Sequence, residues 1–206
     1  RATSADGSTA TQTWTVAVQD VNEFSVSAVT DRDAQADSVL ENAPVGTLVG
    51  VSAWAVDQDA TQSAVRYALT DDAGGRFVID ANTGVVTTAQ VLDAEAALSH
   101  TLVVQATSAD GSTATRTWTV AVADVNEAAV TTPVDTDAAA DSVLENAVIG
   151  TRVGVTASAI DADATNHGVT YTLDNSAGGR FAIDSSTGAV TTAQVLDAET
   201  ALSHTL

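Results

Sequence analysis

Hydrophobic and polar residues alternate in several short stretches of the chain, and each stretch predicts a half-buried β-strand. In residues 11–19, Trp14, Val16 and Val18 fall on one face of an extended strand, and threonine and alanine fall on the other. The pattern therefore places Trp14, like Trp118 in a second stretch of the same kind, in a hydrophobic core. The further stretches with strand character are 46–55, 65–69, 77–80, 84–90, 100–108 and 115–124.

The whole pattern recurs after 104 residues. Residues 2–11 return as 106–115, and residues 87–95 return as 191–199. This period is too long for a solenoid repeat and matches the size of one small domain, so it indicates tandem domains. About seven strands per repeat, separated by Gly-rich and Asp-rich turns, predict an all-β fold of tandem immunoglobulin-like Greek-key β-sandwiches.

The predicted repeat boundaries do not coincide with the two ends of the chain. Residues 1–23 match 105–127, so they are predicted to be the final strands and linker of a preceding repeat. Residues 24–127 form one complete repeat, and 128–206 form a second repeat that lacks its last strands. Two explanations stay open: the chain is an excerpt of a longer array, or residues 1–23 act as a donor segment that completes the second repeat of a neighbouring chain.

The composition narrows the choice of partners. The chain has 27 acidic residues against 7 basic ones, and its net charge is −20. Such a charge repels nucleic acid and anionic lipid, so neither is expected as a partner. No apolar run is long enough to span a membrane, and no direct membrane insertion is expected. With no cysteine, disulfide and thiolate chemistry are excluded.

Acidic residues are concentrated in short motifs that recur in both repeats. These are Leu-Glu-Asn, Asp-x-Asp, Leu-Asp-Ala-Glu, Asp-Val-Asn-Glu and an Ala-Asp-Gly turn, with candidate ligands Asp6, Asp20, Asn22, Glu23, Glu41, Asp57, Asp59, Asp93, Glu95, Asp110, Asp124, Asn126, Glu127, Glu145, Asp161, Asp163, Asp197 and Glu199. Carboxylate, amide and carbonyl oxygens suit Ca²⁺, which takes six to eight of them. The motifs contain no His or Cys, which disfavours zinc and copper. Mg²⁺ would leave most of these oxygens unused.

Six motifs in order resemble the extracellular cadherin repeat, in particular the bacterial cadherin-like modules of surface adhesins and fibres. They are LENAPVGT at 40–47, DQD at 57–59, FVIDANTGVV at 77–86, LDAE at 92–95, ADG at 109–111 and DVNE at 124–127. The resemblance covers essentially the whole chain. It implies an extracellular or cell-surface location and a bacterial source.

The resemblance also implies where the metal lies. In that family calcium sits between consecutive repeats, which predicts two or three Ca²⁺ per junction. The ligands of the complete junction would be Glu41, Asp93, Glu95, Asp124, the carbonyl of Val125, Asn126, Glu127, Asp161 and Asp163. One half-junction would use Asp20, Asn22, Glu23, Asp57, Asp59 and Asp110, and another would use Glu145, Asp197 and Glu199. Asp6 would serve only if residues 1–23 entered another chain. The linker departs from the family pattern, because Glu127 stands where an Asp is usual.

The function expected from these features is non-catalytic: a calcium-stiffened array of repeats in an adhesin or extracellular fibre. Its partners would be neighbouring repeats of the same or adjacent chains and homophilic or other cell-surface ligands. No Ser–His–Asp arrangement or nucleophile motif indicates an enzyme. The alternatives are a passive acidic spacer and a carbohydrate-binding or enzyme-appended module. The latter needs an exposed aromatic platform, for which only Trp54 is available, and Ser158 replaces it in the second repeat.

Overall fold

The computed structural model of the chain describes residues 1–206 and contains strands, turns and loops, with no helix. Accordingly, it offers no long apolar helix of the kind that crosses a membrane. The predicted fold class, an all-β protein of immunoglobulin-like sandwiches, is confirmed.

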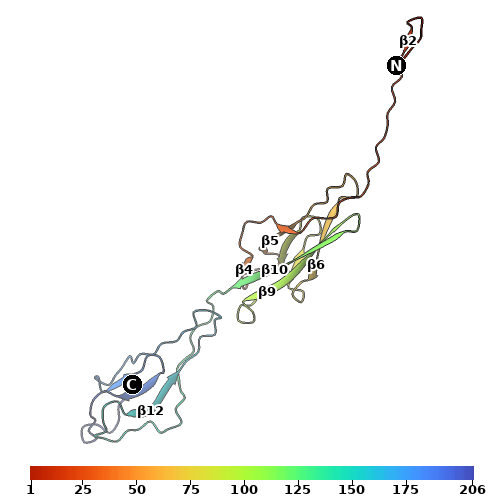
Figure 1. Cartoon of the computed structure of the whole chain (residues 1–206). Helices are drawn as coiled ribbons and strands as arrows, with labels where there is room; N and C mark the ends of the chain where they lie inside the picture. The colour runs from red at the N-terminus through yellow and green to blue at the C-terminus, as the bar shows by residue number, and fades with distance from the viewer. The chain divides into compact units, whose positions relative to one another are not determined.

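Two four-stranded sheets make up the sandwich of the first repeat (Figure 1). One sheet has the order β3 (Thr30–Asp31), β5 (Leu48–Trp54), β8 (Val85–Thr88) and β7 (Phe77–Ile79). The other has the order β4 (Ser38–Leu40), β10 (Thr113–Ala123), β9 (Ser99–Ser108) and β6 (Val65–Asp71). The strands predicted between residues 46 and 124 are therefore present, and short β3 and β4 precede them.

The core of this sandwich is formed by the inward positions of the alternating strands. Val49 and Val51 of β5, Leu102 and Val104 of β9 and Val120 of β10 are at most 2% exposed. Burying each of these side chains contributes about 1.5–3 kcal/mol to folding. In a chain with 4% aromatic residues, packing of these β-branched and aliphatic side chains is the main source of the sandwich's stability.

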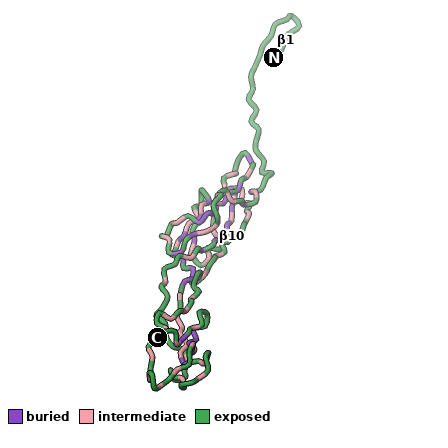
Figure 2. The backbone as a smooth tube through the Cα atoms, turned by 90° about the vertical axis from the view of Figure 1, so that its left-hand side faces the viewer, coloured by how far each residue is buried: buried purple, intermediate pink, exposed green.

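The strand predicted at residues 11–19 is wrong. Only β1 (Ala2–Thr3) and β2 (Thr9–Ala10) pair in this region, as a small hairpin. Trp14 is 75% exposed, whereas its counterpart Trp118 is 4% exposed. Residues 1–25 are exposed throughout (Figure 2). The physical reason is that alternation makes an apolar face, but a strand also needs a sheet to pair with, and residues 11–19 have none.

The second repeat forms a single sheet, with the order β11 (Val134–Asp135), β12 (Arg152–Ser158), β14 (Ala189–Thr192) and β13 (Phe181–Ile183). The counterparts of β4 and β6, at 142–144 and 169–175, are not strands. In the first repeat these two strands flank β10 and β9, and the counterparts of β10 and most of β9 would lie beyond Leu206. Within residues 1–206, the flanking segments therefore have no strand to pair with.

By contacts between Cα atoms the chain divides into two compact units. One contains Arg1–Val39, Pro44–Val91 and His100–Val120, and the other contains Leu40–Ala43, Leu92–Ser99 and Ala121–Leu206. This division differs from the sequence repeats, because two loops of the first repeat group with the second. The repeat boundaries after residues 23 and 127 stay a prediction.

Gly50 of β5 packs closely against the backbone of residue 36. Its φ is +77°, and an added Cβ would lie 2.2 Å from the carbonyl oxygen of Ala36. Gly46, with φ +91°, has open space around the same position. We expect Gly46→Ala to cost about 1–2 kcal/mol from left-handed strain alone, and Gly50→Ala about 2–5 kcal/mol because backbone must also move. Urea denaturation measures both, and equal losses would contradict the close packing of β5 on residue 36.

Candidate metal centres

Glu41 is the buried anchor of the first group of carboxylates. It follows β4 directly, and the next residue, Asn42, turns the chain with φ +57°, a conformation that Asn tolerates better than most residues. Glu41 is 2% exposed. Its Oε2 accepts the N–H of Ala94 at 2.8 Å and its Oε1 accepts the N–H of Val125 at 2.7 Å. One carboxylate therefore fixes three segments that are distant in the sequence.

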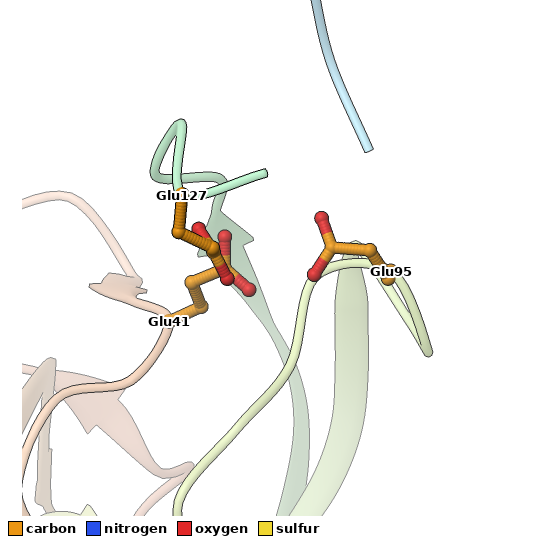
Figure 3. Close-up of side chains that lie close together, drawn as sticks. All are labelled: Glu41, Glu95 and Glu127. Atoms are coloured by element: carbon orange, nitrogen blue, oxygen red, sulfur yellow. The ribbon is translucent and has the colours of Figure 1, made fainter. Parts of the chain in front are cut away.

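Two exposed glutamates converge on Glu41. One carboxylate oxygen from each of Glu41, Glu95 and Glu127 lies within 4.8 Å of the others. Figure 3 shows the three side chains. The side-chain amide of Asn42 donates to Glu127 Oε1 at 2.9 Å and holds that carboxylate near the anchor. Three negative groups thus face one small volume, an arrangement that disfavours the metal-free state and suits a cation.

A second group shares Glu95 and adds Asp124 and Asp163, again with one oxygen of each within 4.8 Å of the others. The N–H of Ala164 donates to Glu95 Oε1 at 2.7 Å and to Asp124 Oδ1 at 3.2 Å. Both the N–H and the hydroxyl of Thr165 donate to Asp124 Oδ2. The linker acid and the Asp-x-Asp loop are therefore positioned by the same short stretch of backbone.

The carboxylate of Asp163 has hydrogen-bond partners on one oxygen only. Its Oδ1 accepts the N–H groups of residues 127–128 at 3.1 and 2.9 Å, while its buried Oδ2 has no hydrogen-bond partner. Asp59 repeats this arrangement: its Oδ1 accepts the N–H groups of residues 23–24 at 3.2 and 3.3 Å, and its Oδ2 is also buried without a partner. Burying an unpaired carboxylate oxygen is costly, and a bound cation removes that cost.

The pKa values of two acids in these groups, Glu127 and Asp124, are shifted in opposite directions. Partial loss of solvent raises the pKa of Glu127, and the neighbouring charge of Glu41 raises it further. The Thr165 hydroxyl, by contrast, lowers the pKa of Asp124, because it donates to the ionised carboxylate. The charged form is thus favoured at Asp124 and opposed at Glu127, where the hydrogen bond from Asn42 offsets only part of the effect of lost solvent and neighbouring charge.

A separate group lies in the first compact unit and consists of Asp57, Asp59 and Asp110, each with one oxygen within 4.8 Å of the others. The side-chain amide of Asn22 donates to Asp110 at 3.1 Å. Asp20 accepts the N–H and hydroxyl of Thr61 at 2.8 and 2.7 Å, as Asp124 accepts those of Thr165. Residues 20–23 therefore meet the first repeat as the linker meets the second.

All three residues of the third group, Glu145, Asp197 and Glu199, are exposed. Glu145 accepts one N–H, that of Ala198 at 3.1 Å, because the counterpart of Val125 would lie beyond Leu206. Asp6 joins none of the groups, and its carboxylate accepts the N–H and hydroxyl of Ser8 in its own turn.

Some of the candidate ligands accept backbone N–H groups of their own loops. Asp93 accepts the N–H of Ala96 at 3.1 Å, and Asp161 accepts the N–H of Asp163 at 3.3 Å. Neither is a member of the three-carboxylate groups, and neither is Glu23. The roles of Asn126 and the Val125 carbonyl stay a prediction. Thr165 and Asn42 were not among the candidates. The signal that identifies them is their identical counterparts in the other repeat, Thr61 and Asn146.

Sandwiches with acidic groups gathered at their loops define the class of protein, and comparisons with known proteins give the family. The profile of the cadherin domain matches residues 35–125 and 140–206. The chain belongs to the cadherin domain family. It is 36% identical over 177 residues to human protocadherin Fat 4, and 38% identical over 179 residues to mouse cadherin EGF LAG seven-pass G-type receptor 1, each match covering 82% of the chain.

Solved structures agree with the sequence relatives. A structure of mouse cadherin-23 EC22-24 matches 88% of the chain, and 57% of its own length is covered, with a TM-score of 0.64 and 28% identity. The protocadherin gammaB4 extracellular domain matches 88% of the chain and 30% of its own, with a TM-score of 0.69 and 25% identity. The chain spans only 3% of human protocadherin Fat 4 and 6% of the mouse receptor.

Glu41 should be important for folding even without metal. In EDTA, Glu41→Ala removes the acceptor of two N–H groups and should lower the free energy of unfolding by about 2–3 kcal/mol. The matched variant Glu145→Ala removes an exposed acceptor of one N–H and should have a much smaller effect. Chemical denaturation followed by circular dichroism compares them, and similar losses would contradict the anchoring role of Glu41.

Proposed function

We propose that this chain is a calcium-binding part of a cell-surface or secreted adhesion protein, in which Ca²⁺ stiffens the connection between successive cadherin repeats. The observation that supports this most directly is the buried, unpartnered Oδ2 of Asp163, which lies in a group of three carboxylates. The oxygens are of the type that Ca²⁺ prefers, and His and Cys are absent from the groups.

Two overlapping groups support more than one ion. They share Glu95, so neighbouring ions could be bridged by it, in line with two or three Ca²⁺ at this junction. The proposed ligands are Glu41, Asp93, Glu95, Asp124, the Val125 carbonyl, Asn126, Glu127, Asp161 and Asp163. Glu127 has a longer side chain than the usual Asp, and its contact with Asn42 keeps its carboxylate near Glu41.

The mechanism follows from charge. Without metal, the acids of Leu40–Ala43, Leu92–Ser99, the linker and the Asp-x-Asp loop repel one another. A divalent ion attracts all of these acids and therefore holds the four segments together. The linker is then fixed in one conformation, because any other conformation would break bonds between the ion and ligands from several segments.

The same proposal extends to the other two acidic groups and to the role of the chain in adhesion. The other two groups would bind Ca²⁺ when a neighbouring repeat, of the same or an adjacent chain, supplies the missing ligands. The chain would act without catalysis, through adhesion to like or unlike surface proteins. The relatives named above are animal proteins, so a bacterial source stays a prediction.

Calcium titration tests the proposal. We expect calorimetry to detect binding, and saturating Ca²⁺ to raise the melting temperature by about 5–10 °C, since a ligand at a hundred times its Kd adds about 2.7 kcal/mol. Asp163→Asn should weaken binding at least about tenfold. Asp184→Asn is the matched control, because Asp184 lies outside the three groups and accepts N–H groups of its own turn.

The alternatives give different results. A passive acidic spacer would show no heat of binding and no change in melting temperature with Ca²⁺. If Mg²⁺ at equal concentration produced the same stabilisation, the charge would matter but the coordination proposed here would be wrong. Small-angle scattering adds the mechanical readout: the maximum dimension should become better defined with Ca²⁺, and unchanged scattering would contradict stiffening.

A further inference from the structure

The outward side of the sheet formed by β3, β5, β8 and β7 in the first repeat is apolar. Leu48 of β5 and Val78 of β7 both pair with Thr87 of β8, so their side chains lie side by side on this face. Leu48 is 62% exposed and Val78 is 51% exposed, and Trp54 near the other end of β5 is 39% exposed. Contiguous apolar side chains on a surface are typical of interaction sites. The apolar face is defined here as Leu48, Trp54, Val78 and Val85.

The second repeat shows that the fold does not require this surface. The inward positions of the sheet, among them Val49, Val51 and Phe77, carry the same residues in both repeats. The four positions of the apolar face all differ, and the second repeat has Arg152, Ser158, Ala182 and Ala189 there. The strands that carry them pair in the same register in both repeats. Large apolar side chains at these outward positions therefore serve a purpose other than folding.

The distribution of charge favours a second copy of the chain as the occupant. The outward positions of β5, β7 and β8 carry no charged side chain, although the net charge of the chain is −20. Two copies repel one another least where uncharged faces meet. A strongly basic partner would instead be attracted to the acidic loops.

Two opposite charges flank the apolar face at the same level of the sheet. Arg32 follows β3 at one edge and donates its N–H to the carbonyl of Ser52 at 2.9 Å. Asp80 follows β7 at the other edge and donates its N–H to the carbonyl of Val85 at 2.9 Å. Ser52 and Val85 are direct partners across β5 and β8. A two-fold axis parallel to the strands therefore brings Arg32 of each copy near Asp80 of the other.

Both side chains are held at their edges. The guanidinium of Arg32 lies 3.7 Å from the centroid of the Trp54 ring and covers one side of it. The Oδ1 atom of Asp80 accepts the N–H groups of residues 82–83 at 2.9 and 2.8 Å. Such fixed charges favour one relative orientation of two copies. The second repeat has Thr136 in place of Arg32, so it lacks this complementarity.

We propose that two copies of the chain associate through the apolar face of the first repeat, with Arg32 of each copy next to Asp80 of the other. This names a surface and a partner for adhesion and rests on the proposed function for its biological role, but the contact itself does not use calcium. From the spacing and rise of the strands, it covers on the order of 500 Å² per copy. Interfaces of this size are weak and transient.

Sedimentation equilibrium at up to about 1 mM chain, in EDTA and in Ca²⁺, tests the proposal. We expect a reversible dimer in both buffers, with a Kd on the order of 0.1–1 mM. Leu48→Arg should weaken dimerisation at least about tenfold, because it places a charged group of each copy in the contact. It should fold normally, since Arg152 occupies the same position in the second repeat. Thr115→Arg is the matched control, because it adds the same charge at an exposed position of the other sheet.

A double-mutant cycle tests the orientation of the two copies. Asp80→Asn removes the charge and keeps an acceptor for the turn, and Arg32→Thr introduces the residue of the second repeat. Each should weaken dimerisation by about three- to tenfold, since two such pairs form in each dimer. The double variant should dimerise as well as the weaker single variant. Additive losses would contradict the pairing of Arg32 with Asp80.

The possible results separate this proposal from the others. A chain that stays monomeric up to about 1 mM would overturn it, and so would dimerisation that Leu48→Arg and Thr115→Arg affect equally. A monomer that binds glycans, and loses that binding with Trp54→Ser, would assign the face to a sugar instead. Any of these results with intact Ca²⁺ binding leaves the calcium function standing. Dimerisation without Ca²⁺ binding would contradict the calcium function alone.

Discussion

Crowded negative charge is the constraint on which the rest of this structure depends. Glu41, Glu95 and Glu127 face one another within 4.8 Å, and Asp163 next to them has a buried oxygen that nothing in the chain satisfies. Repulsion among these acids opposes folding, and a bound cation would offset that cost. The acids of these groups recur in both repeats, so the arrangement belongs to the repeat and not to one place in the chain.

The β-sandwich explains how acids far apart in the sequence come together. Glu41 directly follows β4, Glu95 lies in the loop before β9, and Asp124 directly follows β10. The three strands are neighbours in one sheet, so the acids next to their ends lie at the same edge of that sheet. Backbone N–H groups of the linker and of the Asp-x-Asp loop then donate to these carboxylates and hold them in place. The packed core fixes the positions of the strand ends, and the loops between them carry the acidic side chains.

The sequence predicted most of the fold because alternation, turn residues and the 104-residue period agree. It was wrong at residues 11–19 for a specific reason: an apolar face does not guarantee a partner sheet, and Trp14 is exposed while the identical Trp118 is buried. The same limit explains why 142–144 and 169–175 are not strands. An alternating pattern shows that a segment can form a strand. Whether it does so depends on whether another strand is available to pair with it.

The candidate ligands were chosen from the sequence as acids in recurring motifs, and the structure brings many of them together. Sequence reasoning overlooked the neutral residues that orient them, such as Thr165 at Asp124 and Asn42 at Glu127. Nor did it show that a candidate acid can also accept a backbone N–H of its own turn, as Asp93 accepts that of Ala96. These contacts depend on side-chain direction, which a motif does not encode.

A crystal structure of the chain grown with calcium tests the central claim most directly. The prediction is a strong anomalous or electron-density peak about 2.3–2.6 Å from the Oδ2 atom of Asp163, also coordinated by Glu95 and Asp124. A well-resolved map with only water at that position, under saturating calcium, would contradict it.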